Sequence, residues 1–208
     1  MNIQSILVSL PVFLLAIILH EVAHGWVAYR LGDPTAKWAG RLTLNPVSHI
    51  DPLGAIFFLI SLAAGIGFGW AKPVPVNVYN MKDPRRGMVL VSLAGPAANA
   101  AQALIYALIL RVMGAGIFFP SVDPGLLGYV CYAGVIVNIM LAIFNLLPVP
   151  PLDGSKILMG LLPHRQAYSL SRIEPYGMLI LLFLIFTHSI DYLARHIVFP
   201  AATLLIGA

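Results

Sequence analysis

Residues 6–24 read Ile-Leu-Val-Ser-Leu-Pro-Val-Phe-Leu-Leu-Ala-Ile-Ile-Leu-His-Glu-Val-Ala-His, an uncharged apolar run that ends in two histidines and a glutamate. This pattern is typical of a membrane-spanning helix, which we expect over about Ile3 to Tyr29. On a helix, side chains four residues apart share one face. His20 and His24 can therefore point two imidazoles at one metal ion, with Glu21 beside them.

The composition of the whole chain indicates the same class of protein. Of 208 residues, 60% are hydrophobic and only 10% are charged, and the mean hydropathy is +0.90. A soluble domain carries about 25% charged residues, so the composition predicts an integral, multi-pass membrane protein. The formal charge of +4 does not indicate a nucleic-acid partner, because basic residues in a membrane protein mainly set its orientation. We expect a single membrane-embedded domain over residues 1–208.

The remaining apolar segments predict an all-α polytopic fold with four transmembrane helices. After the first span, which we expect to be retained rather than cleaved as a signal peptide, the clear spans are 88–112, 126–147 and about 176–192. Residues 53–70 are also apolar, contain four glycines and by length could just cross a bilayer. Residues 72–79 alternate like a strand but carry prolines, which predicts a short β-like loop.

A metal centre built on the first span needs a further ligand from elsewhere. The pattern His-Glu-x-x-His supplies two metal ligands and a base, and a catalytic zinc usually has three protein ligands and one open position. The candidates for the third ligand are histidines and aspartates near apolar segments, namely His49, Asp51, Asp153, His164, His188 and Asp191. Asp153 is the best of them, because it follows helix-breaking prolines and an acid at membrane depth is costly without a partner.

Three further side chains are candidates for catalytic roles. Glu21 would act as the general base toward the attacking water and then as the acid toward the leaving amine. Asn99 and Asn145 lie in predicted spans, and either could hold the scissile carbonyl or its oxyanion. The alternative for both asparagines is hydrogen bonding between helices.

Together these residues resemble the site-2 protease family of intramembrane zinc metalloproteases, peptidase family M50. Residues 20–24 match its H-E-x-x-H motif, Gly95–Asn99 match G-P-x-x-N, and Asn145–Gly154 match N-x-x-P-x-P-x-L-D-G, in which the aspartate is the third zinc ligand. The resemblance covers a core of residues 3–155 and is to the compact prokaryotic branch without a PDZ or CBS domain. It implies one Zn²⁺ per chain, held by His20, His24 and Asp153.

The same resemblance implies the substrate and the location. The partner would be the transmembrane segment of a membrane-protein substrate, cleaved within the lipid bilayer in regulated intramembrane proteolysis. The location would be a prokaryotic cell (inner) membrane. Two other functions compete with this hypothesis. A membrane metal-binding or transport protein could use the same histidines, although it needs no glutamate beside them and would favour internal repeats. An inactive protease relative would be expected to lack Glu21, which is present.

The three motifs also bear on the path of residues 53–70. His24 lies toward the end of the first span, Asn99 toward the start of the second, and Asp153 just past the third. If they meet, those ends share one membrane face, so residues 53–70 form a re-entrant or interfacial segment, with five spans as the alternative. The 12 Lys and Arg residues then divide 10 to 2 in favour of the motif face, against 7 to 5 for a single crossing. The positive-inside rule prefers the first division and places the active site toward the cytoplasm and both termini outside.

Overall fold

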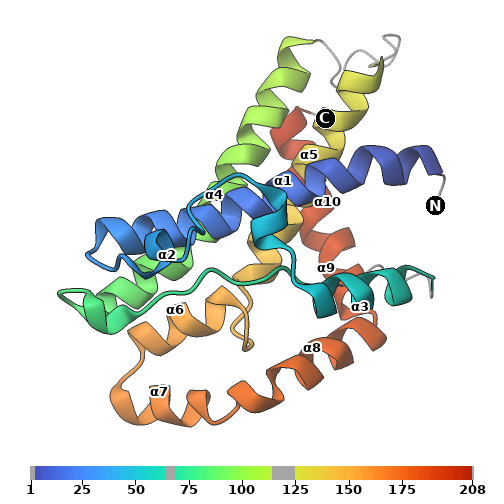
Figure 1. The fold of residues 1–208 in the computed structure, drawn as a ribbon. Helices are drawn as coiled ribbons and strands as arrows, with labels where there is room; N and C mark the ends of the chain where they lie inside the picture. The colour runs from blue at the N-terminus through green and yellow to red at the C-terminus, as the bar shows by residue number, and fades with distance from the viewer. Residues whose placement is uncertain (1–2, 64–68, 114–124, 208) are drawn as a thin grey trace.

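The computed structural model describes residues 3–63, 69–113 and 125–207, which form a bundle of helices without a sheet in these ranges (Figure 1). The long elements are α1 (Ile3–Arg30), α4 (Pro84–Val112) and α5 (Gly125–Asn145). The prediction of an all-α polytopic fold is therefore confirmed. The shorter elements are α2 (Thr35–Trp38), η1 (Pro46–His49), α3 (Pro52–Ala63), η2 (Val78–Asn80), α6 (Asp153–Leu161), α7 (His164–Ser171), η3 (Glu174–Tyr176), α8 (Gly177–Phe186), α9 (Ser189–Leu193), η4 (Ala194–Val198) and α10 (Phe199–Ile206).

Helix α4 is the centre of the bundle, since α1, α5, α6 and α10 all pack against it. Small residues let the helices approach closely, as is usual between membrane helices. At the α4–α5 contact, for example, a Cβ on Gly134 would lie 2.4 Å from a ring carbon of Tyr106. Ala103 and Ala107 of α4 belong to the same buried apolar cluster as Cys131 and Val135 of α5.

A buried carboxylate ties the extended segment before α4 to the end of α1. Asp33 is fully buried and accepts hydrogen bonds from the backbone amides of Thr35 (3.1 Å) and Asn77 (2.6 Å) and from the Asn80 side chain (2.7 Å). Burial disfavours the charged form, but these hydrogen bonds outweigh it and lower the pKa of Asp33. Residues 72–77 are thereby held alongside α1 as an extended loop, as the proline pattern predicted.

The two flanks of residues 53–70 lie side by side. Helix α3 has 12 residues, about 18 Å, which is short of the ~30 Å hydrocarbon core. Its two flanks meet, because Ile50 and Ala71 form an antiparallel bridge and the Lys72 amide donates to the His49 carbonyl at 2.9 Å. Residues 64–68 lie outside the described part of the chain. The meeting of the flanks confirms that the segment makes no net crossing.

The residues predicted as the last span, about 176–192, do not form one continuous helix. Helix α8 ends at Phe186, and the chain turns at His188, whose φ of 54° lies in the left-handed region. Ten residues of α8 cover about 15 Å, half of the bilayer core. The sequence-based interpretation missed this break because the turn Thr187-His188-Ser189 contains neither glycine nor proline.

A further segment of spanning length follows this turn. Residues Ser189–Ile206 form α9, η4 and α10, which together are long and apolar enough to span a membrane. Val198, Ala202 and Ile206 pack into the apolar cluster of α4 and α5. Figure 1 shows α10 running in the same direction as α4, with the C-terminus beside the far end of α4. Accordingly, Arg111 at the end of α4 donates to the carbonyl of Leu204 at 3.1 Å.

This arrangement leaves four net crossings, although five segments qualify by length and composition. Helix α5 ends on the membrane face where α4 begins, and α10 ends on the opposite face, beside the end of α4. The chain therefore enters α9 on the face where it left α5. The apolar segment His164–Phe186, broken between α7 and α8, consequently makes no net crossing and, like α3, stays on the motif side.

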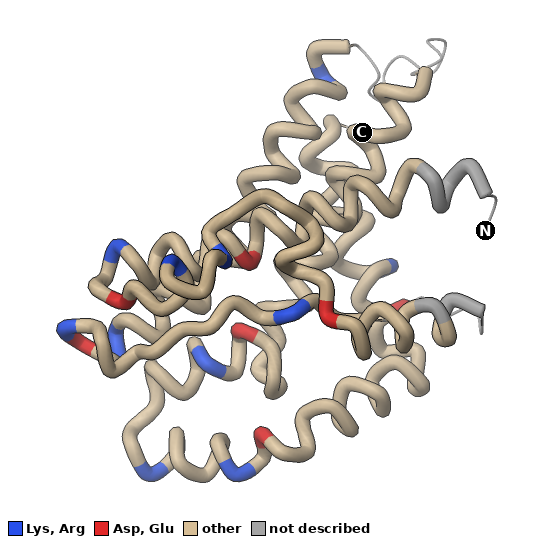
Figure 2. The backbone as a smooth tube through the Cα atoms, viewed as in Figure 1, with Lys and Arg blue, Asp and Glu red and all other residues tan. Residues whose placement is uncertain are grey.

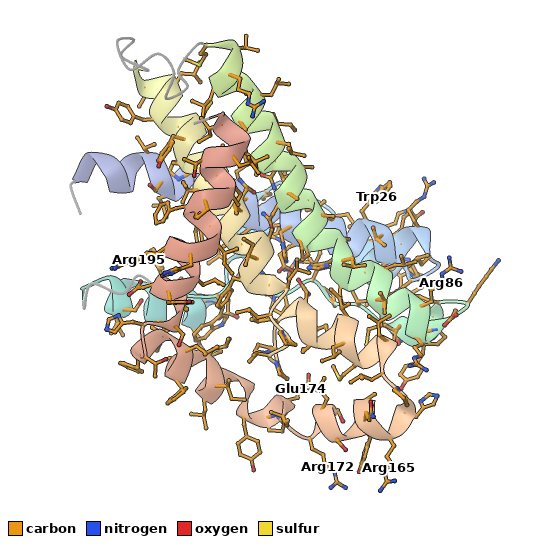
Figure 3. All side chains as sticks on the ribbon, turned by 180° about the vertical axis from the view of Figure 1, so that it is seen from behind. Trp26, Arg86, Arg165, Arg172, Glu174 and Arg195 are labelled. Atoms are coloured by element: carbon orange, nitrogen blue, oxygen red, sulfur yellow. The ribbon has the colours of Figure 1, made fainter. Side chains whose placement is uncertain are left out.

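Charge follows the same division. Lys and Arg gather on the loops and helix ends at the left and bottom of Figure 2, whereas Arg111 is the basic residue at the far end of α4. Figure 3 shows Arg86, Arg165 and Arg172 pointing outward from one end of the molecule. The 12 basic residues divide into 10 on the motif side, Arg111 on the other side and Arg195 within the last span.

Cysteine labelling tests this topology. In a Cys131→Ser background, we expect Lys82→Cys and His188→Cys to react with a membrane-impermeant reagent from the same side of sealed vesicles. A cysteine appended after the last residue should react from the opposite side, with Val112→Cys as its reference. Reaction of His188→Cys on the side of Val112→Cys would show that His164–Phe186 crosses the membrane.

Candidate active site

His20, His24 and Asp153 meet at one point beneath α4. The Nε2 atoms of the two histidines are 3.0 Å apart, and each lies 3.1 Å from Oδ2 of Asp153. All three residues are buried. Helix α1 places the two histidines on one face, and the first turn of α6 supplies the aspartate. The structure therefore brings together the three residues that the sequence predicts as metal ligands.

The three atoms have the geometry of one face of a zinc tetrahedron. Ligand atoms 2.0–2.1 Å from a tetrahedral zinc are about 3.3 Å apart, close to the 3.0–3.1 Å sides observed here. Gly95 of α4 provides the room, because a Cβ at this position would lie 2.4 Å from Nε2 of His24 and 2.5 Å from Nε2 of His20. Any larger residue at position 95 would therefore clash with both imidazoles.

Hydrogen bonds on the far side of each ring fix the tautomers. The carbonyl of Val91 can only accept, so Nδ1 of His24, 2.7 Å away, carries the proton. Oδ1 of Asn99 lies 2.6 Å from Nδ1 of His20, and the Asn99 amide already donates to the carbonyl of Ala16 (3.2 Å) and to Asn138 (2.9 Å). Nδ1 of His20 is therefore also a donor. Both Nε2 atoms then present lone pairs toward the carboxylate, a donor set suited to a cation.

The surroundings of Asn99 favour the alternative prediction, hydrogen bonding between helices. Asn99 is fully buried behind His20, and its oxygen and its nitrogen are both engaged within the protein. These contacts place it to orient the imidazole of His20. Asn138 of α5 is also fully buried. It extends this series of hydrogen bonds by donating to the carbonyl of Gly134 at 2.9 Å. The sequence analysis missed Asn138, although a lone amide in the middle of an apolar span is the kind of signal that could have identified it.

Glu21 lies beside the metal ligands, with its carboxylate held by backbone. The amide of Val74, in the extended segment before α4, donates to Oε2 of Glu21 at 2.8 Å. Both residues line a cavity of about 490 Å³ that also exposes the three candidate ligands. This contact explains the position of the β-like loop, since the loop forms one wall of the site.

Asn145 and Lys156 also line this cavity. Asn145, at the end of α5, lies in the wall, and its amide donates to the carbonyl of Leu141 at 3.0 Å. Lys156 of α6 has its ammonium 3.8 Å from Oδ1 of Asp153 and is the one cationic side chain in the described lining. In the sequence it was one of many basic residues near a membrane face, so its place in the cavity was not predicted.

The other candidate ligands lie elsewhere. His49 bonds the carbonyl of Thr43 through Nε2 at 2.8 Å, and Asp51 caps α3 by accepting from the Gly54 amide. His188 and Asp191 form a pair 2.8 Å apart at the surface. His164 is exposed at the start of α7. Of the described histidines, cysteines and acids, His20, His24 and Asp153 form the cluster able to hold a metal.

A paired histidine motif, a buried aspartate and an adjacent glutamate around one cavity define a membrane-embedded metalloprotease. Comparison with known proteins agrees. The model of peptidase family M50 matches residues 119–188. The chain is 43% identical to "Putative zinc metalloprotease YwhC" of Bacillus subtilis (strain 168), over 81% of this chain and 75% of the relative.

Similarity extends to proteins of the same description from other bacteria. The chain is 32% identical to Rip2 of Mycolicibacterium smegmatis, over 86% of this chain and 66% of the relative, and 33% identical to Rip2 of Mycobacterium tuberculosis (strain H37Rv), over 83% and 63%. No solved structure gives a significant match. The chain thus belongs to peptidase family M50, the zinc metalloendopeptidases of the site-2 protease type, and its cofactor is Zn²⁺.

Replacing Asn99 tests whether it supports the metal centre. Asn99→Ala leaves Nδ1 of His20 without its acceptor, so we expect zinc affinity to fall about 10- to 100-fold. Competition with a chromophoric chelator on detergent-purified protein measures this affinity. Asn77→Ala, which changes an asparagine outside the site, serves as the control. Unchanged zinc affinity in Asn99→Ala would assign this residue to helix packing alone.

Proposed function

We propose that this protein hydrolyses a peptide bond in or near the transmembrane segment of a membrane-protein substrate, as in regulated intramembrane proteolysis. The observation that carries the proposal is the donor set of His20, His24 and Asp153 beside Glu21, in one cavity of a membrane-spanning bundle. A soluble substrate would not need a site placed where the spans α1, α4 and α5 converge.

We assign His20, His24 and Asp153 as the zinc ligands. When bound, zinc polarises the scissile carbonyl and makes water a stronger nucleophile at neutral pH. Glu21 accepts the proton of the attacking water and delivers it to the leaving amine. The hydrogen bond from Val74 keeps the Glu21 carboxylate turned toward the cavity while the proton is transferred.

Asn145 is the residue that we assign to the scissile carbonyl. Asn99 is removed from this role by its burial, whereas Asn145 lines the cavity at the end of α5. An amide donor directed at the carbonyl oxygen stabilises the negative charge that develops during attack. Lys156 adds a positive charge to the same cavity, which offsets part of the charge of the two carboxylates.

The substrate must be locally extended in this site. In a helix the carbonyl groups are engaged in i to i−4 hydrogen bonds and are hidden from attack. Residues 69–78 run along the cavity, and an extended wall can pair with an extended substrate through backbone hydrogen bonds. The substrate segment therefore unwinds before it reaches Glu21.

The location that we propose is a prokaryotic cell (inner) membrane, with the active site toward the cytoplasm. The support is the charge division of the 12 basic residues, 10 of which lie on the side of the motifs. Cytoplasmic loops carry such an excess of Lys and Arg. The four net crossings then leave both termini outside.

Glu21→Gln separates the base from the ligands. We expect the variant to keep its zinc and to lose proteolysis by more than about 100-fold, because only the proton acceptor is removed. Detergent-purified wild type and variant are incubated with single-pass substrates, and the metal content of both is measured. A variant that cleaves at the wild-type rate refutes this mechanism, and a wild type that binds zinc without cleaving any substrate favours a metal-binding role.

Asp153→Ala tests the third ligand. We expect loss of both zinc and activity, because two histidines alone leave the site incomplete and the remaining donors were placed for three-fold binding. His49→Ala is the matched control for zinc content, because His49 is also a buried histidine but its ring bonds the Thr43 carbonyl away from the candidate ligands. Equal zinc content in wild type and Asp153→Ala would require a different ligand.

A further inference from the structure

A second cavity adjoins the catalytic cavity on the bilayer side. It has a volume of about 280 Å³ and lies between α1, α3 and the returning segment at Trp70. Its walls are mainly apolar, with Leu10, Leu14, Ala55 and Phe58 among them. It shares five wall residues with the catalytic cavity, namely Phe13, Ile17, Gly69, Trp70 and Ala71. The two cavities are therefore adjacent and share this wall.

Two glycines bring the walls of this second cavity together. A Cβ on Gly54 of α3 would lie 2.2 Å from the carbonyl oxygen of Trp70, and a Cβ on Gly69 would lie 2.6 Å from Cβ of Phe58. The Ile50–Ala71 bridge closes the base of the same loop. At these two points α3 and the returning segment are in close contact, and a side chain larger than that of glycine would push them apart.

The depth of the second cavity follows from α1. Leu10 and Leu14 lie ten and six residues before His20, which at 1.5 Å per residue is about 9–15 Å further toward the outer face. This depth falls within the bilayer. The part of a substrate that has not yet unwound into the catalytic cavity is located at the same depth.

Residues 70–74 form an extended wall strand of the catalytic cavity. The distance along this wall strand gives the substrate position that faces the second cavity. Glu21 is held at Val74, and Trp70 precedes Val74 by four residues. In an extended chain four residues span about 13 Å. A substrate lying along this wall with its reactive carbonyl at Glu21 therefore reaches the second cavity about four residues from the scissile bond.

We propose that the second cavity is a specificity pocket that binds one large apolar side chain of the substrate, about four residues from the scissile bond on its bilayer side. The proposal rests on the proposed function. Adjacency to the catalytic cavity identifies the occupant, since a substrate chain lying along residues 70–74 runs past the wall that the second cavity shares. A lipid chain has no such connection to the reactive carbonyl.

A substrate scan combined with pocket variants tests the specificity pocket. Single-pass substrates carry Ala or Phe at each position within six residues of the cut, and the kcat/KM ratio for Phe over Ala is measured at each. Wild type should prefer Phe about tenfold at one position near the fourth residue. Ala55→Phe, which fills the pocket, should reduce that ratio to about one.

Matched control variants show whether a change in the Phe over Ala ratio comes from the pocket itself. Ile56→Phe places the same side chain at the neighbouring α3 position, which is 55% exposed and outside the pocket wall, so it should keep the wild-type ratio. Leu14→Ala should enlarge the pocket and shift the preference from Phe to Trp, whereas Leu15→Ala should not. If Ala55→Phe fails to fold, the comparison of Leu14→Ala with Leu15→Ala still tests the specificity pocket.

Three results would overturn the specificity pocket. They are the absence of any position with a preference, an unchanged ratio in Ala55→Phe, and an unchanged preference in Leu14→Ala. Each of them is measured while wild type still cleaves and Glu21→Gln does not, so the proposed proteolysis stands. Loss of the difference between wild type and Glu21→Gln would instead refute the proteolytic function itself.

Discussion

The whole bundle depends on holding three hydrogen-bond acceptors about 3 Å apart in a buried place. Two imidazole nitrogens and a carboxylate oxygen repel one another unless a cation lies among them, and in a low-dielectric interior that repulsion is large. The protein holds these atoms in place through hydrogen bonds to the opposite nitrogen of each imidazole ring. Asn99 and the carbonyl of Val91 turn both histidines, and both belong to α4. Binding of zinc and assembly of the three spans are therefore one process.

Helix α4 carries this support because it is made of small residues where it meets the site. Gly95 leaves room at the ligands, and Asn99, one turn later, reaches both α1 and α5. A bulkier helix would stand further from α1 and lose the hydrogen bond to His20. Close packing in a membrane, which elsewhere serves only association, here sets the geometry of a metal centre.

The fold class, and the three side chains that meet as candidate ligands, could be predicted from the sequence because those features leave local signals. Histidines four residues apart share a helix face, and long uncharged runs identify spans. The role of Asn99 was not predictable in this way, since a buried amide can face a substrate or a ligand and the pattern is the same. The break inside the predicted last span was also not predictable in this way. The turn at His188 contains neither glycine nor proline, so no residue there signals the end of the helix.

The bond between Val74 and Glu21 has a consequence for the register of the wall strand. Pro73 and Pro75 flank Val74 and have no amide hydrogen. Val74 is therefore the one backbone donor among these three residues, and a slip of the strand by one residue in either direction would present the carboxylate with a proline. Because neither proline can donate a hydrogen bond, only one register of residues 73–75 places an amide hydrogen opposite Glu21. The missing proline donors thereby fix the alignment of this wall.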